Sequence, residues 1–467
     1  MRYFACMAVA LALPAHALIE PCPSDCDGGS AVTVDEIVTT VGIALGDQPV
    51  ERCIAADQSC DDQVTVDEVV SGVDSALTGC ATEARGTLAV AASAPVGVIR
   101  TNEEGVVIGG TPWMPAQYDV NEPPEARVDV YAQGLEVPWA MAFAPDGRLF
   151  VTERPGRIRV IDGGVLQPTS WASPEGVHTI GESGLLGIAV HPNFPTPAYV
   201  YVCHTLIIGT EVQNRVVRFE EVDGRGANPL PIVEGFPGSS VHDGCRLKFG
   251  PDGKLYISTG DGARRALAQN LSSTAGKILR VNDDGSASPD NPFPEAPLVW
   301  SYGHRNPQGL AFHPETGELY ATEHGPSHEI GIGAYDEVNR IEPGVNYGWP
   351  AAIGAPMLAQ YRDPLLTYPA PSGPAPPSGA SFYSGELVPE WQGDLFVGIL
   401  GAEHLHRVGF DACGRIAALE RLYPNIYGRL RDVVHGPDGA LYVSTSNRDG
   451  RGTPHPDDDR ILRISGS

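Results

Sequence analysis

The sequence predicts an all-β fold, a six-bladed β-propeller, preceded by a small α-helical module. From about residue 127 onwards a strand–turn–strand pattern occurs six times, and each copy is followed by a third strand rich in arginine and β-branched residues. The 467 residues also include 55 glycines and 42 prolines without a collagen-like period, which is typical of a protein with many tight turns. Repeated turn-linked strands favour a propeller with one four-stranded sheet per copy. A β-sandwich would not explain the repetition.

The first element along the chain is a predicted secretory signal at residues 1–17. Arg2 precedes an apolar stretch at residues 3–13, and Ala15-His16-Ala17 fits the small-x-small cleavage rule. The stretch is too short to span a membrane, and no other apolar run approaches that length. We therefore expect a periplasmic or secreted protein without a membrane span. Eight cysteines follow the signal, and an even count in an exported chain favours disulfides.

Residues 18–80 form a predicted separate module with 13 acidic residues and one basic residue. The stretch Val32-Thr-Val-Asp-Glu36 recurs 32 residues later as Val64-Thr-Val-Asp-Glu68, so each copy is expected to be an acidic loop followed by an amphipathic helix. The loops offer oxygen ligands at calcium-loop spacing. The candidate ligands are Asp25, Asp27 and Glu36 in the first copy, and Asp57, Ser59, Asp61, Gln63 (through its carbonyl) and Glu68 in the second.

This arrangement resembles a dockerin-like or EF-hand-like duplicated calcium module, which implies a protein partner or a small appended domain. The alternative is a solvated acidic module held by disulfides, without calcium. Residues 81–126, rich in Ala, Gly and Pro, are predicted to be a linker with one strand within residues 96–108. The β-propeller is then expected over residues 127–467.

The six copies follow one another in order. Their first two strands are predicted at residues 141–152, 188–203, 247–258, 310–321, 381–397 and 433–444, and their third strands at 157–160, 215–218, 277–280, 337–340, 404–407 and 460–463. The chain's formal charge of −27 argues against binding to nucleic acid or to anionic lipid, because both need basic surfaces. Loops between the strands line the mouth of a propeller, where such folds place ligand sites.

Several of these loops are too elaborate to be turns alone. Val241-His-Asp-Gly-Cys-Arg246 and Ser258-Thr-Gly-Asp-Gly262 bring a histidine and carboxylates, the usual components of a general base. Arg305, Arg429 and Arg431 offer rigid donor forks suited to a polycarboxylate ligand. Taken singly, each of these residues also has a purely structural interpretation.

The large domain resembles the soluble quinoprotein sugar dehydrogenases of the glucose/sorbosone dehydrogenase family, which use pyrroloquinoline quinone (PQQ) and calcium. The resemblance rests on motifs in the family's order: Gly-Leu-Leu-Gly187, His242-x-Gly-x-Arg-Leu, Gly-Asp-Gly262, Gly303-His-Arg-Asn-Pro-Gln-Gly, Glu323-His-Gly-Pro, Asn346-Tyr-Gly-Trp-Pro and Gly428-Arg-Leu-Arg-Asp. It implies an aldose dehydrogenase that oxidises the C1 hydroxyl to a lactone and passes electrons to a redox acceptor, a quinone or a cytochrome.

The resemblance also implies roles for single residues. His242 is the expected base, Asp261 orients it, and Arg305 stabilises the oxyanion. The expected cofactor-binding residues are Glu182, His242, Arg305, Asn306, Asp336, Arg429 and Arg431. The expected calcium ligands are the carbonyls of Gly325 and Pro326, with Glu337 nearby.

Two positions depart from the family pattern. Gly401 stands where a Lys or Arg usually reaches the quinone, and His404, His406 or Arg407 are candidates to compensate. Cys245 replaces a common glycine, and Cys203 is its expected disulfide partner. The loss at Gly401 leaves open a non-catalytic propeller that binds carbohydrate or protein. A calcium-dependent propeller lactonase ranks last, because it needs carboxylate and Asn side chains converging on one metal.

Overall fold

The structure is a computed structural model that describes Ser24, Cys26 and residues 32–48, 52–53, 56–57, 63–78, 98–110, 126–327, 333–369, 375–410 and 414–466. The chain divides into two compact units. The smaller comprises Met1–Val90 with Phe410–Ala417, and the larger comprises Ala91–Gly409 with Ala418–Ser467. The predicted signal at residues 1–17 lies outside the described residues. Within the described part, no helix is long and apolar enough to cross a membrane.

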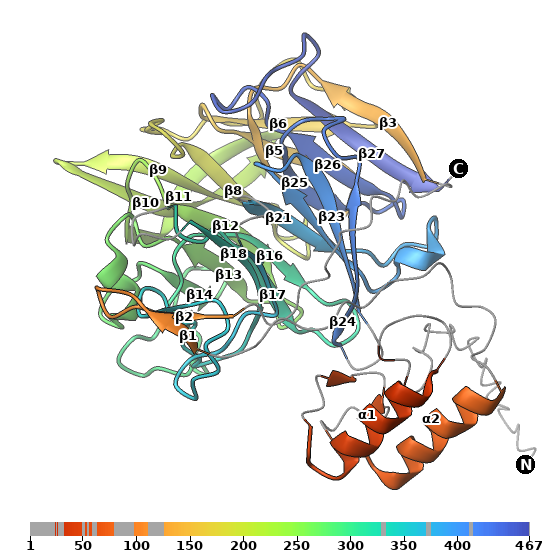
Figure 1. Cartoon of the computed structure of the whole chain (residues 1–467). Helices are drawn as coiled ribbons and strands as arrows, with labels where there is room; N and C mark the ends of the chain where they lie inside the picture. The colour runs from red at the N-terminus through yellow and green to blue at the C-terminus, as the bar shows by residue number, and fades with distance from the viewer. Residues whose placement is uncertain are drawn as a thin grey trace, which may run out of the picture. The chain divides into compact units, whose positions relative to one another are not determined.

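The described residues of the smaller unit include two α-helices, each beginning within one copy of the sequence repeat: α1 (Val34–Ala44) and α2 (Val66–Thr78) (Figure 1). Thr33 begins α1 with a capping box, in which its side chain accepts from the backbone of Glu36 while Glu36 accepts from the backbone of Thr33. A disulfide joins Cys26 to Cys53, and Cys53 packs in the small core of the unit.

Three predicted calcium ligands have other partners in this unit. Glu36 and Glu68 accept hydrogen bonds from the backbone and hydroxyl of the threonine that precedes each helix, at 2.7 to 2.9 Å. Asp57 is buried and forms an ion pair with Arg415 at 2.9 Å. Gln63 is described as well, whereas Asp25, Asp27, Ser59 and Asp61 lie outside the described residues. Calcium binding by these loops stays a prediction.

The larger unit is built from strands, as the sequence predicts (Figure 1). Twelve of the strands in its four-stranded sheets are β4 (Pro138–Phe143), β5 (Leu149–Glu153), β6 (Arg157–Asp162), β7 (Val165–Leu166), β8 (Leu185–Val190), β9 (Tyr199–Ile208), β10 (Glu211–Val222), β11 (Arg225–Pro237), β12 (Gly244–Phe249), β13 (Leu255–Thr259), β14 (Lys277–Val281) and β15 (Val299–Tyr302). The remaining ones are β16 (Pro307–Phe312), β17 (Leu319–Glu323), β18 (Ala334–Ile341), β20 (Leu366–Pro369), β21 (Pro377–Phe382), β22 (Leu395–Ile399), β23 (His404–Phe410), β24 (Ile416–Leu422), β25 (Leu430–His435), β26 (Leu441–Thr445), β27 (Arg460–Gly466) and β3 (Ala126–Gln133). Short 3-10 turns lie at Arg265–Gln269 and Pro389–Trp391.

These strands form six four-stranded sheets. In chain order the sheets are β4–β7 (sheet 1), β8–β11 (sheet 2), β12–β15 (sheet 3), β16, β17, β18 and β20 (sheet 4), β21–β24 (sheet 5), and β25–β27 with β3 (sheet 6). The first strand of each sheet contacts the first strand of the next, and β25 contacts β4. Sheet 6 therefore combines the strand that precedes the first repeat with the last strand of the chain.

A further three-stranded sheet contains β1 (Val98–Thr101), β2 (Val107–Gly109) and β19 (Ala352–Ile353). The segment predicted as a linker with one strand thus provides two strands that pair with the larger unit, β2 running parallel to β19. Ile108 and Ile353 pack together with the buried Trp349.

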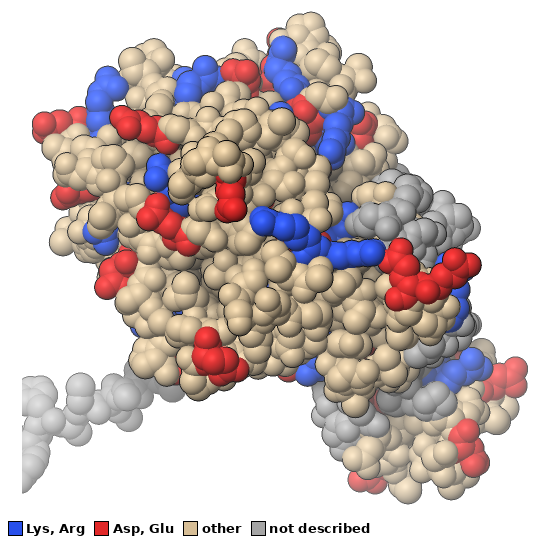
Figure 2. Space-filling model, turned by 90° about the vertical axis from the view of Figure 1, so that its left-hand side faces the viewer, with Lys and Arg blue, Asp and Glu red and all other residues tan. Residues whose placement is uncertain are grey.

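The pairing of the first two strands in every sheet determines where the loops meet. The strands are antiparallel, so the start of the first strand lies beside the end of the second, as in Pro138↔Glu153, Gly244↔Thr259 and Pro307↔Glu323. These first strands are buried on both faces, as shown by Leu185–Val190, where every side chain is buried. Loops that enter a first strand or leave a second strand therefore share one edge of each sheet. On the face of the molecule shown in Figure 2, acidic and basic side chains are interspersed among large uncharged areas.

Candidate functional site

A histidine–carboxylate pair lies at this edge of sheet 3. His242 precedes β12 and Asp261 follows β13, and the Nδ1 of His242 is 2.8 Å from the Oδ1 of Asp261. Asp261 is almost fully buried, and its other oxygen accepts a hydrogen bond from the indole N–H of Trp349 at 2.9 Å. Because a carboxylate only accepts, the proton of the neutral ring lies on Nδ1, and Nε2 is left as a proton acceptor.

Glu182 holds the backbone of this histidine. Its Oε2 accepts from the backbone N–H of His242 at 3.3 Å, and its Oε1 forms an ion pair with Arg451 at 2.9 Å. Burial opposes ionisation of Glu182, but the charge of Arg451 and the His242 N–H favour the carboxylate, and the pKa of Glu182 lies below its ordinary value. Glu182 is therefore a half-buried anion beside the proposed base.

Arg305 and Asn306 lie on the connection from β15 to β16. The Arg305 carbonyl accepts from the backbone N–H of Asp261 at 2.8 Å, and its guanidinium lies 5.5 Å from the centre of the Trp349 ring. Asn306 is fully buried; its oxygen accepts from the N–H of Gly244 at 3.1 Å, and its Nδ2 has no hydrogen-bond partner among the described residues. An unpartnered buried donor is costly unless a ligand satisfies it.

The carboxylate of Glu323 anchors the same connection. It accepts from the backbone N–H groups of Arg305 and Asn306 and, at 2.9 Å, from the Nδ1 of His304. His324 follows Glu323 directly, and its carbonyl accepts from Arg305 at 3.0 Å. Burial lowers the pKa of His324 to about 3, so this ring is neutral at physiological pH.

A cavity of about 180 Å³ lies at the common edge, and its wall contains residues from each of the six sheets or from the loops that adjoin them. Four arginines line it, Arg154, Arg429, Arg431 and Arg451. The carboxylates there are Glu182, Asp449 and Asp243. Asp449 bridges Arg429 and Arg431 at 2.9 and 3.0 Å.

The cavity carries more positive than negative charge. Burial opposes the charge of Asp449, but Arg431 and Arg429 outweigh it and lower its pKa, so this carboxylate is ionised. Burial lowers the pKa of Arg431 to about 10. Burial raises the pKa of Asp243 to about 7, so this third carboxyl is only about half ionised near neutrality. Four guanidinium groups thus face two firmly ionised carboxylates, an arrangement that favours an anionic ligand.

The predicted metal ligands Gly325 and Pro326 are buried on the connection that follows β17. Asp336 holds this connection, because its two oxygens accept from the backbone N–H groups of Gly325 and Ala375, both at 3.0 Å. Glu337 lies opposite Glu323 in the β17–β18 register; burial, and then the charge of Glu323, raise the pKa of Glu337. No group of three or more His, Cys, Asp or Glu side chains suited to a metal occurs in the described part of the chain.

The three residues considered as substitutes for the missing cation at Gly401 do not line this cavity. His404 and His406 are buried, with their Nδ1 atoms at 2.9 Å from the Ala402 carbonyl and 2.6 Å from the Tyr368 hydroxyl. Arg407 forms ion pairs with Asp394 and Glu420. Strand β23 thus directs these side chains to other partners, and their compensation for Gly401 stays an untested prediction. Arg154 and Arg451 supply positive charge at the cavity instead.

Sequence reasoning missed Arg154, Arg451, Asp449, His324 and Trp349. The signal that could have found three of them is positional. Arg154 follows β5, His324 follows β17 and Asp449 lies just beyond β26, so each leaves a second strand at the shared edge, as Asp261 does after β13. The predicted disulfide between Cys203 and Cys245 is present beside the His242 loop.

Comparison with known proteins identifies this arrangement. A family model described as glucose/sorbosone dehydrogenase matches residues 135–462, most of the chain. The chain belongs to the glucose/sorbosone dehydrogenase family. Aldose sugar dehydrogenase YliI of Escherichia coli is 30% identical to this family member over 70% of this chain and 92% of its own length.

Solved structures of the same family resemble this chain closely. A putative oxidoreductase (glucose dehydrogenase) from Thermus thermophilus is 46% identical, with a TM-score of 0.67, covering 73% of this chain and 99% of its own. The PQQ-bound aldose sugar dehydrogenase of Streptomyces coelicolor is 35% identical, with a TM-score of 0.65, covering 74% of this chain and all of its own. The larger unit is accordingly a β-propeller of the glucose/sorbosone dehydrogenase family, whose relatives oxidise sugars.

Proposed function

We propose that this chain is an exported oxidoreductase that oxidises the C1 hydroxyl of an aldose to a lactone, using PQQ and calcium. The observation that carries the proposal is the His242–Asp261 pair at the same edge as an arginine-rich cavity, in a chain whose relatives are sugar dehydrogenases. A proton acceptor and an anion-binding site are the two protein parts that such a reaction requires.

His242 accepts the proton of the sugar hydroxyl at Nε2. Asp261 holds Nδ1, stabilises the imidazolium that results, and is itself fixed by Trp349 at 2.9 Å. Glu182 fixes the backbone of His242, and the charge of Arg305 stabilises the developing oxyanion. Trp349 supports Asp261 and Arg305, since its N–H donates to the Asp261 carboxylate and its ring lies beside the Arg305 guanidinium.

The residues present fit an anionic quinone cofactor. Arg429 and Arg431, with Arg154 and Arg451, would bind the carboxylates of PQQ, and the unpartnered Nδ2 of Asn306 would donate to it. When bound, the quinone supplies the acceptor for the hydride that leaves the sugar carbon. Carbonyl oxygens are suitable ligands for calcium, and we assign this role to Gly325 and Pro326 on the loop that Asp336 holds. Glu337 is assigned a place near this ion, whose charge would favour the ionised carboxylate that burial and Glu323 oppose.

We further propose that the six sheets are the blades of one closed propeller over residues 127–467. The cyclic contacts of their first strands and the pairing of β3 with β27 support closure. The signal at residues 1–17 supports a periplasmic or secreted location. The duplicated acidic repeat at residues 18–80 supports a dockerin-like module that binds calcium and a protein partner. The reduced cofactor would pass its electrons to an external quinone or cytochrome.

The test is a titration of the purified protein with PQQ and calcium, monitored by absorbance and by dye-linked oxidation of several aldoses. We expect saturable cofactor binding, sugar-dependent dye reduction, and loss of that reduction in His242→Ala with cofactor binding retained. Absence of quinone binding at micromolar concentration would refute the proposal and favour a non-catalytic binding propeller. Such a propeller is the alternative because Gly401 lacks the usual cation.

A further inference from the structure

The loop that carries His242 has an unfavourable backbone conformation. His242 and Cys245 both adopt the left-handed region, with φ of 59° and 68°, although neither is glycine. Non-glycine residues avoid this region because of a steric clash at Cβ, and they remain in it only when their surroundings fix them. The position of the proposed base therefore depends on what holds residues 241–246.

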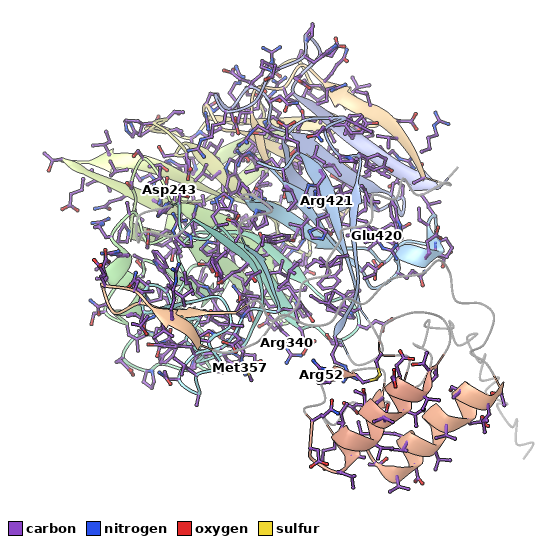
Figure 3. All side chains as sticks on the ribbon, viewed as in Figure 1. Arg52, Asp243, Arg340, Met357, Glu420 and Arg421 are labelled. Carbon is purple, nitrogen blue, oxygen red and sulfur yellow. A yellow bond between two sulfur atoms is a disulfide. The ribbon has the colours of Figure 1, made fainter. Side chains whose placement is uncertain are left out.

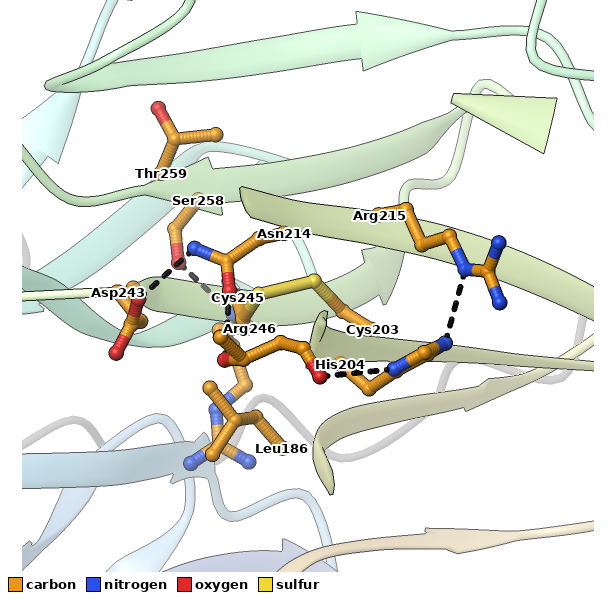
Figure 4. Close-up of a disulfide and its surroundings, with 12 residues drawn as sticks. Leu186, Cys203, His204, Asn214, Arg215, Asp243, Cys245, Arg246, Ser258 and Thr259 are labelled. Atoms are coloured by element: carbon orange, nitrogen blue, oxygen red, sulfur yellow. Dashed lines mark hydrogen bonds between the residues drawn. A yellow bond between two sulfur atoms is a disulfide. The ribbon is translucent and has the colours of Figure 1, made fainter. Parts of the chain in front are cut away.

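A covalent bond holds the far end of this loop. Cys245 lies on β12 of sheet 3, and Cys203 lies on β9 of sheet 2, so their disulfide joins two neighbouring sheets (Figure 4). Both cysteines are fully buried. The cross-link is three residues from His242 and opposes any movement of the loop away from sheet 2.

A buried hydrogen bond forms a second tether between the same two sheets. Asn214 of β10 donates to Asp243 at 3.0 Å and itself accepts from Thr205 of β9 at 2.7 Å (Figure 4). The same oxygen of Asp243 accepts from the backbone N–H of Ser239 at 3.1 Å. Asp243 is 2% exposed and lies where sheets 2 and 3 meet (Figure 3). The disulfide and this hydrogen bond thus hold residues 243 and 245, directly after the base.

We propose that the Cys203–Cys245 disulfide and the Asn214–Asp243 hydrogen bond act together as a clamp that positions His242. Asp243, Asn214 and the two cysteines are positioning residues. Without the clamp, the loop keeps contacts within sheet 3 and its neighbours: the His242–Asp261 pair, the backbone bonds to Glu182 and Asn306, the bonds from the Gly262 and Gly260 N–H groups to the His242 and Asp243 carbonyls, and those of Arg246. Among these, only the bond to Glu182 ties the loop toward sheet 2. The left-handed residues then relax, and the His242 ring loses its alignment with Asp261. The catalytic part of this inference rests on the proposed function, whereas the structural part does not.

Hydrogen–deuterium exchange tests the clamp without cofactor or turnover. In Cys203→Ala/Cys245→Ala and in Asp243→Ala, we expect the amides of residues 241–246 to exchange at least about tenfold faster. Peptides from β26 serve as the internal control, because β26 belongs to sheet 6 and the clamp joins sheets 2 and 3. These peptides should exchange as in the wild-type protein. Unchanged exchange of residues 241–246, or equal acceleration in every sheet, would overturn the clamp.

Kinetics and a conservative variant complete the test. Both clamp variants should lower kcat about tenfold. In Cys203→Ala/Cys245→Ala, KM for the sugar and the affinity for PQQ should stay within about twofold, because neither cysteine lines the cavity and the base, not the binding residues, has moved. Asp243→Asn keeps the acceptor for Asn214 and should restore wild-type exchange and kcat. Cys26→Ala/Cys53→Ala removes the disulfide of the smaller unit and is the matched control. An unchanged kcat in both clamp variants would refute the positioning role, and an inactive wild-type protein would refute only the proposed function.

Discussion

Replacing Asp261 by asparagine is the sharpest test of the site, because the three groups around this carboxylate are all donors. Its Oδ1 accepts from His242 and from the Ala263 N–H at 2.8 Å, and its Oδ2 accepts from Trp349 at 2.9 Å. An amide offers one oxygen and one NH₂ group. If the oxygen turns to His242, the NH₂ group meets the Trp349 N–H; if it turns to Trp349, the NH₂ group meets His242 and Ala263.

Each orientation has a different consequence. When the NH₂ group meets His242, the ring must accept at Nδ1, so its proton moves to Nε2 and the base is lost. The analogous substitution in a serine protease triad lowers kcat about 10⁴-fold, which corresponds to roughly 5 kcal/mol of barrier. When the NH₂ group meets Trp349, a buried donor loses its partner, at a cost of about 1–3 kcal/mol. We expect a loss between about 10²-fold and 10⁴-fold, depending on the balance of the two orientations.

The second substitution Trp349→Phe separates these effects. It removes the N–H that opposes the favourable orientation while keeping a ring beside Arg305. Asp261→Asn/Trp349→Phe should therefore oxidise sugar faster than Asp261→Asn, although Trp349→Phe alone is slower than the wild-type protein. The assay is dye-linked aldose oxidation at saturating PQQ and calcium, with cofactor affinity measured separately by absorbance. Activity of Asp261→Asn within threefold of wild type, or simple multiplication of the two losses, would refute this reasoning.

Four further predictions concern charge, pH, metal and helix capping. Arg431→Gln should weaken PQQ binding at least about tenfold in an equilibrium absorbance titration, since a charged donor contributes about 1.5–3 kcal/mol; unchanged affinity would show that the cavity does not bind the cofactor. Burial raises the pKa of Asp243 from 3.8 to about 7. Between these two pH values, Asp243 is mostly protonated in the folded protein and mostly ionised in the unfolded chain. The free energy of unfolding should thus fall as pH rises through this window. Asp243→Asn should become more stable than the wild type above pH 7, as measured by Tm, and an equal Tm difference at pH 4 and pH 8 would contradict this. A calcium chelator should abolish sugar oxidation, and calcium but not magnesium should restore it; full activity after chelation would exclude a catalytic calcium. Thr33→Ala removes the cap of α1 and should destabilise that helix by about 0.5–2 kcal/mol, seen as faster amide exchange in α1 alone; unaltered exchange would mean that the cap contributes nothing.

The repeated strand pattern was sufficient to predict the sheets of the larger unit, because turn residues and β-branched strands are local signals. The family resemblance implied that Asp261 orients His242, and the structure shows why the two meet: one precedes a first strand and the other follows the second strand of the same hairpin. The family resemblance led to the cysteine pair, which the structure contains.

The sequence was less informative where one residue type serves two purposes. Glu36 and Glu68 stand at calcium-loop positions, yet the same Thr-x-x-Glu spacing is a helix capping box, and the structure shows these contacts. Arg154 and Arg451 look like exposed turn residues, because nothing local shows that they meet Asp449 or Glu182 across different sheets. The ion pair of Asp57 with Arg415 joins residues 358 apart, and no local pattern predicts such a partner.

The pairing of β3 with β27 has a consequence for how this domain folds. The hydrogen bond from the backbone N–H of Val137 to Asp459 joins residues 322 apart, and it lies at the same junction. Closing so long a loop has a large entropic cost, and proteins dominated by distant contacts fold slowly. The last sheet therefore forms only after the final strand has been synthesised, so loss of the last few residues would leave β3 and β26 with open edges. Premature termination near Arg460 should for that reason yield an aggregation-prone chain rather than a slightly shortened enzyme.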